Sequence, residues 1–365
     1  MATTTTNYGW TVPTSSDLVK NGATAISTVG QSVDTFLFRP FTRNGALNSG
    51  FNVWQRATSI AVTSATATYT ADRWNFYPNG ATNAQTVSRQ VTNDTTNLPN
   101  IQYCGRFQRN SGQTGTGNIF LCNSFESVNS IPYIGKQVTF SFYARAGANF
   151  SSASNALAYK VYTGTGTDQL SNTGYTGAAA FVSATATLTT TWQRFTATGT
   201  ASSSGTEVSI EFSHTPSGTA GTNDYYEITG VQLEVGNQVS PYAPATPTYA
   251  TELAACQRYY YTLISGTGLT FGNCGYYSAT DVLGTVFFPV QMRTAPTLSA
   301  ASGSYYEAVR SAGSNALTSL SANLISTLTA NIFAGSAQGA SGVIGVAGQY
   351  RTTSASANIA FSAEL

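Results

Sequence analysis

The chain has 365 residues, of which only 8 % are charged, and its formal net charge is +1. A chain this neutral has no basic surface with which to neutralise phosphates, so the composition argues against nucleic-acid binding. Its hydrophobic share of 41 %, with 21 Tyr and 19 Phe, is enough for a core and argues against disorder.

Strand-forming and turn-forming residues dominate the composition. Thr, Ser, Val, Tyr and Phe favour half-buried strands, and Gly and Asn favour turns. We therefore predict an all-β protein, with a short N-terminal arm and helix followed by two β-sandwich (jelly-roll-like) domains. The sequence MATTTTNYGW lacks the basic and apolar regions of a signal peptide, and no apolar run is long enough to insert into a membrane.

Residues 1–43 form the first predicted region. The polar arm ends in Tyr8 and Trp10, which are candidates to anchor the chain to another protein, although Trp10 could instead pack within its own bundle. Ser15 to Asp17 offer a helix N-cap after Pro13. The helix that follows carries an apolar stripe at heptad spacing, which predicts an oligomer interface or a face packed on the same chain; it consists of Val19, Ile26, Val29, Val33 and Phe36.

Residues 44–244 form the second predicted region, a β-sandwich. Val138, Phe140 and Phe142 alternate with polar residues, and segment 207–215 shows the same pattern. A period of two residues places one face of each strand in a core. Trp54, Trp74 and Trp192 occur in apolar or alternating contexts, so we expect them in this core.

Residues 245–250 are predicted to be a Pro-rich linker, because three prolines occur between residues 241 and 247. Residues 251–365 are predicted to form a second, distal and host-facing sandwich. Segment 315–333 fits a helix by its leucine spacing and a strand by its alternation, and its flanking glycines favour strands.

The sequence ELAACQRYYY opens this last region. A catalytic Cys256 would need a base, and the only histidine, His214, lies in another domain. We expect residues 252–257 to be a short lead-in segment and residues 258–263 to be a strand with aromatic side chains on both faces. Such aromatics favour a core plus an oligomer interface, with a ligand platform as the alternative; they are Tyr259, Tyr260 and Tyr261.

Tyrosine pairs in the distal domain are the candidates for sugar binding. A sugar needs a flat aromatic ring for its apolar face and nearby polar groups for its hydroxyls. In an alternating strand one member of each pair points away from the core. The glycan-binding candidates are Tyr276, Tyr277, Tyr305, Tyr306 and the nearby Asn273.

Residue types for catalysis or for zinc binding are scarce. The four cysteines, at 104, 122, 256 and 274, have no CxxC spacing; the pairs eighteen residues apart could be hairpin neighbours, and the alternative is four buried thiols. The 15 acidic residues show no local pair of the kind that glycosidases use. We therefore expect no enzyme, no catalytic residues and no metal.

Several motifs together resemble those of tailed-phage tail fibres. Segment 7–34 resembles the N-terminal part of tail-fibre and minor tail proteins. The sequences NSGFNVWQRATS, YTADRW, GKQVTFSFYARA, TTWQRFTATGT and ITGVQLEVG are similar to a carbohydrate-binding-module-like jelly roll of phage fibres. ELAACQRYYY, FFPVQMRTAPT and SAEL resemble the C-terminal domain that follows it.

This resemblance implies a homotrimeric virion protein, assembled in the host cytoplasm, whose N-terminus attaches to other tail proteins and whose sandwich domains bind host cell-surface polysaccharide. The alternative is a capsid decoration, collar or neck fibre with protein contacts only. Related modules often hold calcium with an acid near residues 48–52, which is absent here. Asp224, Glu227 and Glu234 are possible calcium ligands, although we interpret them as surface carboxylates.

Overall fold

The computed structural model describes residues 3–4, 10–14, 16, 18, 21–37, 44–79, 84–98, 100–171, 174–311 and 313–365. It divides the chain into two compact units, Met1–Arg43 and Asn44–Leu365. Each unit is described by itself below.

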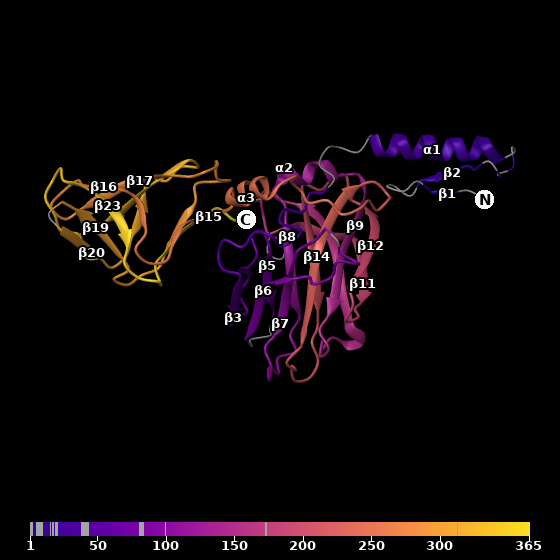
Figure 1. Ribbon diagram of the computed structural model, residues 1–365, viewed down its shortest axis with the longest axis horizontal. Helices are drawn as coiled ribbons and strands as arrows, with labels where there is room; N and C mark the ends of the chain where they lie inside the picture. Colours follow the sequence, from indigo (N-terminus) through magenta and orange to yellow (C-terminus); the bar gives the residue numbers. More distant parts are fainter. Residues whose placement is uncertain are drawn as a thin grey trace. The chain divides into compact units, whose positions relative to one another are not determined.

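The first unit contains one helix and two short strands. Strands β1 (Thr3–Thr4) and β2 (Thr11–Val12) pair antiparallel, and α1 (Gly22–Leu37) contacts β2 (Figure 1). Val29 and Val33 are half-buried on the helix, whereas Ile26 is 68 % exposed. Of the predicted stripe, Val19 lies outside the described residues, and so does the side chain of Phe36.

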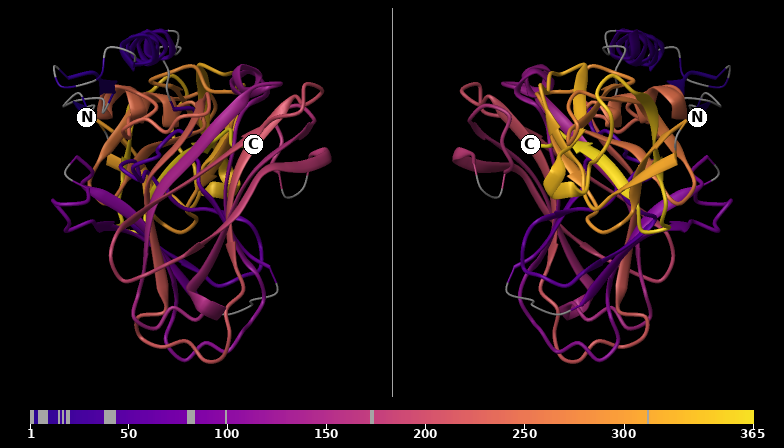
Figure 2. Two further views of the ribbon diagram at one scale, coloured as in Figure 1. Left: turned by 90° about the vertical axis from the view of Figure 1, so that its right-hand side faces the viewer. Right: turned by 90° about the vertical axis from the view of Figure 1, so that its left-hand side faces the viewer.

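The first part of the second unit is a jelly roll of two six-stranded sheets (Figures 1 and 2). One sheet has the order β12-β9-β14-β7-β6-β3 and the other β11-β10-β13-β8-β5-β4. The strands are β3 (Ser59–Val62), β4 (Thr68–Tyr69), β5 (Asn75–Pro78), β6 (Gln85–Val91), β7 (Tyr103–Arg109), β8 (Ile119–Ser124), β9 (Gln137–Ala146), β10 (Ala156–Thr165), β11 (Thr176–Thr187), β12 (Gln193–Thr200), β13 (Glu207–His214) and β14 (Tyr225–Val235). Short helical turns lie at α2 (Ser127–Ser130), η2 (Ile131–Tyr133) and η3 (Ala153–Asn155).

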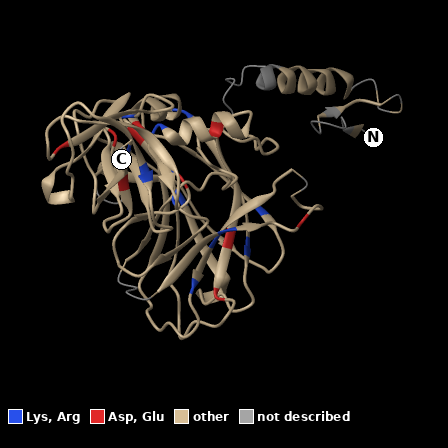
Figure 3. Cartoon of the chain, turned by 60° about the vertical axis from the view of Figure 1, so that its left-hand side comes forward, with Lys and Arg blue, Asp and Glu red and all other residues tan. Residues whose placement is uncertain are grey.

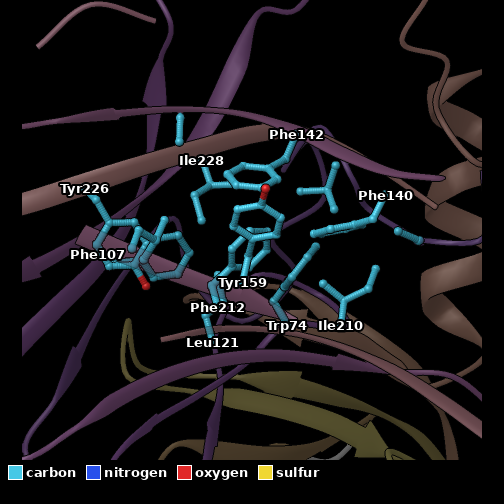
Figure 4. Packing of buried hydrophobic residues seen from close by; sticks show 14 of the residues in the cluster. Trp74, Phe107, Leu121, Phe140, Phe142, Tyr159, Ile210, Phe212, Tyr226 and Ile228 are labelled. Carbon is cyan, nitrogen blue, oxygen red and sulfur yellow. The ribbon is translucent and has the colours of Figure 1, made fainter. Parts of the chain in front are cut away.

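The jelly-roll core is aromatic and lies between the two sheets (Figure 4). Phe140 and Phe142 of β9 meet Phe212 of β13 at ring-centre distances of 5.8 and 4.8 Å. The alternation predicted for these strands therefore places their apolar faces correctly. Trp74 is fully buried in the same core, whereas Trp192 packs in a separate small cluster with Leu98 and Cys104.

The last part of the second unit is a smaller β-domain. A three-stranded sheet has the order β15-β24-β18, and a seven-stranded sheet has the order β20-β19-β23-β16-β17-β22-β21. The elements are α3 (Tyr249–Gln257), β15 (Tyr260–Ser265), β16 (Thr270–Tyr276), β17 (Val282–Phe287), β18 (Thr297–Ala300), β19 (Tyr306–Arg310), β20 (Gly313–Leu317), β21 (Ser321–Asn323), β22 (Thr329–Ala334), η4 (Ser336–Gln338), β23 (Ala347–Thr352) and β24 (Asn358–Ser362). Segment 315–333 thus contains parts of β20, β21 and β22 and no helix, as its flanking glycines indicated.

The ELAACQRYYY segment joins the two parts of this unit, and the structure adds detail to the predictions made for it. Residues 252–257 belong to helix α3, which begins after a Thr248 cap. Tyr259 is buried with its ring 3.7 Å from the guanidinium of Arg73 of the jelly roll, so it is not available to another subunit. Tyr260 is half-buried with its ring over Arg56 at 3.6 Å, and its place in an oligomer interface stays a prediction. Tyr261 is half-buried against Phe288 within the domain.

The predicted fold class is confirmed, since strands predominate and sheets face each other in sandwiches. All four cysteines are buried free thiols, the second of the two alternatives. Charged residues are few and scattered (Figure 3). Among the described residues, no helix combines the length and the apolar character needed to cross a membrane.

Candidate functional site

A groove of about 510 Å³ lies between the jelly roll and the segment that runs from Tyr242 into α3. Four separate segments line it: the turn at residues 50–52, strand β6, the approach to β7, and the linker with the first turn of α3. Its lining residues are Gly50, Asn52, Arg89, Asn100, Ile101, Gln102, Tyr103, Tyr242, Pro244, Thr246, Pro247, Thr248, Tyr249 and Glu252.

Hydrogen bonds hold the residues that lead into the linker, Tyr242 and Ala243, on the jelly roll. The side-chain amide of Asn44 donates to the carbonyl oxygen of Ala243 at 3.0 Å, and Gln232 Oε1 accepts from the backbone N–H of Ala243 at 2.8 Å. The Tyr242 hydroxyl lies 2.9 Å from Ser49 Oγ. The chain that leads into the predicted linker is therefore fixed on the jelly roll, and the last two residues of that linker, 249 and 250, belong to helix α3.

Helix α3 begins at the groove because the sequence supplies a cap. The Thr248 hydroxyl accepts a hydrogen bond from the Thr251 backbone N–H at 3.3 Å, and the Thr251 hydroxyl accepts one from the Thr248 N–H at 3.2 Å. Such a reciprocal capping box satisfies backbone donors that the first turn leaves open. The cap places Tyr249 at the rim and Glu252 one turn later, at the floor.

The groove combines aromatic rings with neutral hydrogen-bonding groups. Tyr249 is 58 % exposed, and Tyr103 and Tyr242 are half-buried. The amide side chains of Asn52, Asn100 and Gln102 also line the groove. A sugar requires rings that cover its apolar face together with amides that donate to and accept from its hydroxyls.

One basic and one acidic side chain are among the described residues that line the groove, and they do not pair with each other. Arg89 donates from Nη1 to the Asn52 carbonyl oxygen at 3.2 Å, and its guanidinium lies 4.6 Å from the centre of the Tyr103 ring. Glu252 is 2 % exposed and accepts from Asn52 Nδ2 at 3.3 Å. Burial raises the pKa of Glu252, although the Asn52 amide and the nearby Asn48 N–H act in the opposite direction.

Two predicted glycan-binding residues are buried, so their rings cannot stack on a sugar, and these predictions were wrong. Tyr276 is 3 % exposed; its hydroxyl donates to Asn315 Oδ1 at 3.1 Å and accepts from Arg310 Nη1 at 2.8 Å. Tyr306 is fully buried, and its hydroxyl donates to the Asn358 carbonyl oxygen at 2.9 Å. Both belong to the core face of the seven-stranded sheet.

The other three candidates are accessible but do not form one site. Tyr277 is 78 % exposed, Asn273 is exposed on β16, and Tyr305 is half-buried. Both tyrosines can be located along β23. The backbone N–H of Thr353, just after β23, donates to the Tyr305 carbonyl oxygen. The backbone N–H of Tyr276, next to Tyr277, donates to the carbonyl oxygen of Val346, which lies seven residues before Thr353. Seven residues of extended strand span roughly 23 Å, so Tyr277 and Tyr305 lie near opposite ends of the sheet.

The N-terminal anchor candidates are only partly described. Tyr8 lies outside the described residues, and Trp10 is half-buried. Their proposed role in attachment therefore stays a prediction.

The three carboxylates considered as calcium ligands are buried, so their interpretation as surface residues was wrong. Asp224 pairs with Arg109 at 2.8 Å. Glu227 pairs with arginines on both sides, at 2.6 and 2.5 Å. Glu234 accepts from the Ser240 hydroxyl at 2.7 Å and from an amide at 2.9 Å. These donors already occupy the carboxylate oxygens that a calcium ion would need. Within the described ranges, no cluster of three or more potential metal-binding side chains occurs.

The groove was not predicted from the sequence. Its residues come from segments up to about 200 positions apart, and no local motif connects them. One signal was present in the sequence, however. Tyr242 and Tyr249 lie on either side of Pro244 and Pro247, in a segment that otherwise contains small and polar residues.

No family model and no curated protein matches the sequence. Among solved structures, the chain is similar to a protein described under "CBM4 structure and function", with 18 % identity over 52 % of this chain and 98 % of that one, at a TM-score of 0.31. The CBM22-1 xylan-binding domain of Xyn10C from Paenibacillus barcinonensis matches with 12 % identity over 49 % and 95 %, at 0.30. Tailspike protein 4 of bacteriophage CBA120 matches with 11 % identity over 53 % and 21 %, at 0.31.

Proposed function

We propose that the chain is a non-enzymatic, glycan-binding fibre protein of a tailed phage. In this proposal the N-terminal unit attaches to other tail proteins, and the second unit binds host cell-surface polysaccharide. The phage assignment is supported by the ordered set of fibre-like motifs, from segment 7–34 to the closing SAEL. The protein is then a component of the exposed tail, assembled in the host cytoplasm.

The groove beside α3 is the observation that carries glycan binding. Three tyrosines and three amides surround a space of about 510 Å³, the size of an ordinary ligand site. A stable interface with a protein partner usually covers roughly 800 Å² on each side, whereas the groove is a confined space lined by rings and amides. Glycan binding is therefore a better fit to these residues than a purely structural role as collar or neck fibre.

Binding without catalysis is supported by the acid content of the groove. Glycoside hydrolysis generally needs two positioned carboxyl groups. Glu252 is the one acidic side chain among the described residues that line the groove. The proposed protein therefore holds its glycan without cleaving it and needs neither a metal nor a cofactor.

Trimer formation belongs to the same proposal. The stripe on α1 leaves Ile26 exposed within its own chain, and a parallel bundle of identical helices would cover it. Three copies would raise the effective affinity of individually weak sites by multivalency.

Competition for adsorption tests the proposal. The full chain is added to host cells, and the phage particles that still adsorb are counted. We expect the wild type to block adsorption in a dose-dependent way and Tyr249→Ala to block it weakly. Tyr277→Ala removes an exposed tyrosine outside the groove and should block like the wild type. A folded chain that neither binds cells nor blocks the phage would favour the structural role.

A further inference from the structure

A row of side-chain amides crosses the outer face of the seven-stranded sheet. Asn323 of β21 lies opposite Asn331 of β22, and Asn331 lies opposite Thr285 of β17. Asn273 of β16 lies opposite Gln349 of β23. The register of β16 with β17, extended by two residues, places Asn273 opposite Thr285. These five residues, the amide row, therefore lie on five adjacent strands. Four steps of about 4.8 Å between strands make the row roughly 19 Å long.

The amide row faces away from the domain core. Cys274, which follows Asn273, is buried in that core. Successive side chains of a strand point to opposite faces, so Asn273 points outward. Asn273, Gln349 and Asn323 are exposed, and among the described residues their side chains make no hydrogen bond. Their amide donors and acceptors are therefore open to a ligand.

One hydrogen bond fixes the middle of the row. The Thr285 hydroxyl donates to Asn331 Oδ1 at 2.8 Å. Within the described part of the chain, the amide nitrogen of Asn331 has no partner of its own. Asn is a poor strand former, so amides at matching positions of neighbouring strands are not explained by the stability of the sheet.

An exposed aromatic ring lies beside the row. Phe287, two residues after Thr285 and on the same face of β17, is 74 % exposed. No Asp, Glu, Lys or Arg occurs in β16, β17, β21 or β22, all of which are described in full. On β23, Arg351 follows Gln349 by two residues and pairs with Glu307 at 2.6 Å. The four strands thus offer a ring and open amides without a charge.

We propose that this face of the C-terminal domain is a second glycan-binding site, which takes a segment of uncharged polysaccharide. The apolar face of a sugar stacks on Phe287, and the sugar hydroxyls donate to and accept from the amide row. A carboxylate or phosphate would find no unpaired cation among the described residues of these strands. The inference rests on the proposed function for its ligand class, host glycan, but uses a different site, because no residue of the row lines the groove. Tyr277 lies four residues beyond Asn273, roughly 13 Å along the chain, and is not part of the row.

A second copy of the chain is the competing occupant of this face. Leu324 and Leu328, in the turn between β21 and β22, are 80 % and 55 % exposed, and a partner copy could cover them together with Phe287. A stable interface, however, covers roughly 800 Å² on each side with an apolar centre. The row presents amides at its centre, which suits hydroxyl groups better. Light scattering separates the two occupants, because only a partner copy changes the mass of the assembly.

Phe287→Trp reports binding at this face directly, because an indole keeps a ring for stacking and its emission responds when a ligand covers it. The full chain with this change is titrated with neutral oligosaccharides of increasing length, and the wild type supplies the signal of the native tryptophans. We expect the emission to shift to shorter wavelength, and Asn273→Ala, added to this chain, to weaken the titration about fivefold through a lost hydrogen bond. Asn237→Ala removes an exposed amide of the jelly roll and should leave the titration unchanged, as should Tyr249→Ala in the groove. Thermal unfolding verifies that each variant is folded.

Each outcome separates the inference from the proposed function. If isothermal titration shows that glycan binds the folded chain, yet the emission of Phe287→Trp never changes, the inference is overturned while binding in the groove stands. The same holds if Asn273→Ala weakens the titration no more than Asn237→Ala does. A smaller oligomer for Phe287→Ala, with unchanged glycan affinity, would assign the face to a second copy and also overturn the inference. If no neutral glycan binds a folded wild-type chain, glycan binding itself fails and the inference fails with it.

Discussion

The guanidinium of Arg73 lies 3.7 Å from the centre of the Tyr259 ring, so an arginine of the jelly roll is stacked on the tyrosine that precedes β15. Arg73 also donates to Glu364 at 2.5 Å and to the Ser124 carbonyl oxygen at 2.6 Å. Arg56 contacts the other Glu364 carboxylate oxygen at 3.0 Å. Glu364 thus joins two jelly-roll arginines to the C-terminal domain at a site with little solvent.

Removing the charge of Glu364 should loosen this junction. Glu364→Gln leaves the buried Arg73 without its anion, and loss of one partner of a buried pair costs about 3 kcal/mol or more. We expect urea unfolding to show that loss. As a control, Arg351→Gln breaks a pair whose arginine is half-exposed, and it should cost about 1 kcal/mol or less. Equal losses in the two variants would contradict this account of the junction.

The buried His214 should make the free energy of unfolding depend on pH. Burial lowers the pKa of His214 to about 3, and the charge of Arg109 acts in the same direction. Between its ordinary value near 6.5 and this lowered value, the unfolded chain binds a proton that the folded chain does not. Stability from this source is therefore complete above pH 6.5 and is lost as the pH falls towards 3.

His214→Phe should flatten that part of the profile. The ring of His214 packs against Phe150 and Tyr226, so another aromatic ring suits the site. In that pH range the wild type should lose up to about 1.4 kcal/mol per pH unit more than the variant. Urea unfolding at several pH values measures the difference, and identical slopes would show that His214 takes up no proton on unfolding.

The predicted oligomer interface on α1 can be tested at one residue. Ile26→Asp places a charge in the apolar stripe, whereas Ser27→Asp places the same charge on an adjacent exposed position. If identical helices bury the stripe, the first change should dissociate the oligomer and the second should not. Light scattering gives the mass of each, and an unchanged mass for Ile26→Asp would locate the interface elsewhere.

The alternation of apolar and polar residues predicted the strands, but it did not predict which distant residues the sheets place side by side. Val208, Ile210 and Phe212 face the core because strand geometry repeats every two residues, which is a local property. The groove depends on long-range pairing: β6 beside β7 brings Arg89 near Tyr103, and residues 242–249 line the same space. Tyr259 is a second example, because the sequence gives its aromatic ring but does not predict that Arg73 stacks on it.

Binding to the groove should depend little on salt. Its arginine is engaged within the protein, and we assign recognition to stacking and hydrogen bonds, which counter-ions screen weakly. Raising NaCl from about 50 to about 500 mM should change the dissociation constant of a neutral glycan less than about twofold. A tenfold loss over the same range would indicate binding through charge.

The affinity of two tyrosine variants for the tightest-binding neutral glycan is the most direct test of the groove. Tyr249 and Tyr277 are both exposed, so alanine at either position should leave the fold intact. By isothermal titration of the full chain, we expect Tyr249→Ala to weaken binding about fivefold to tenfold through loss of stacking, and Tyr277→Ala to match the wild type. Unchanged affinity in Tyr249→Ala together with a loss in Tyr277→Ala would contradict the account and move the site to the C-terminal domain.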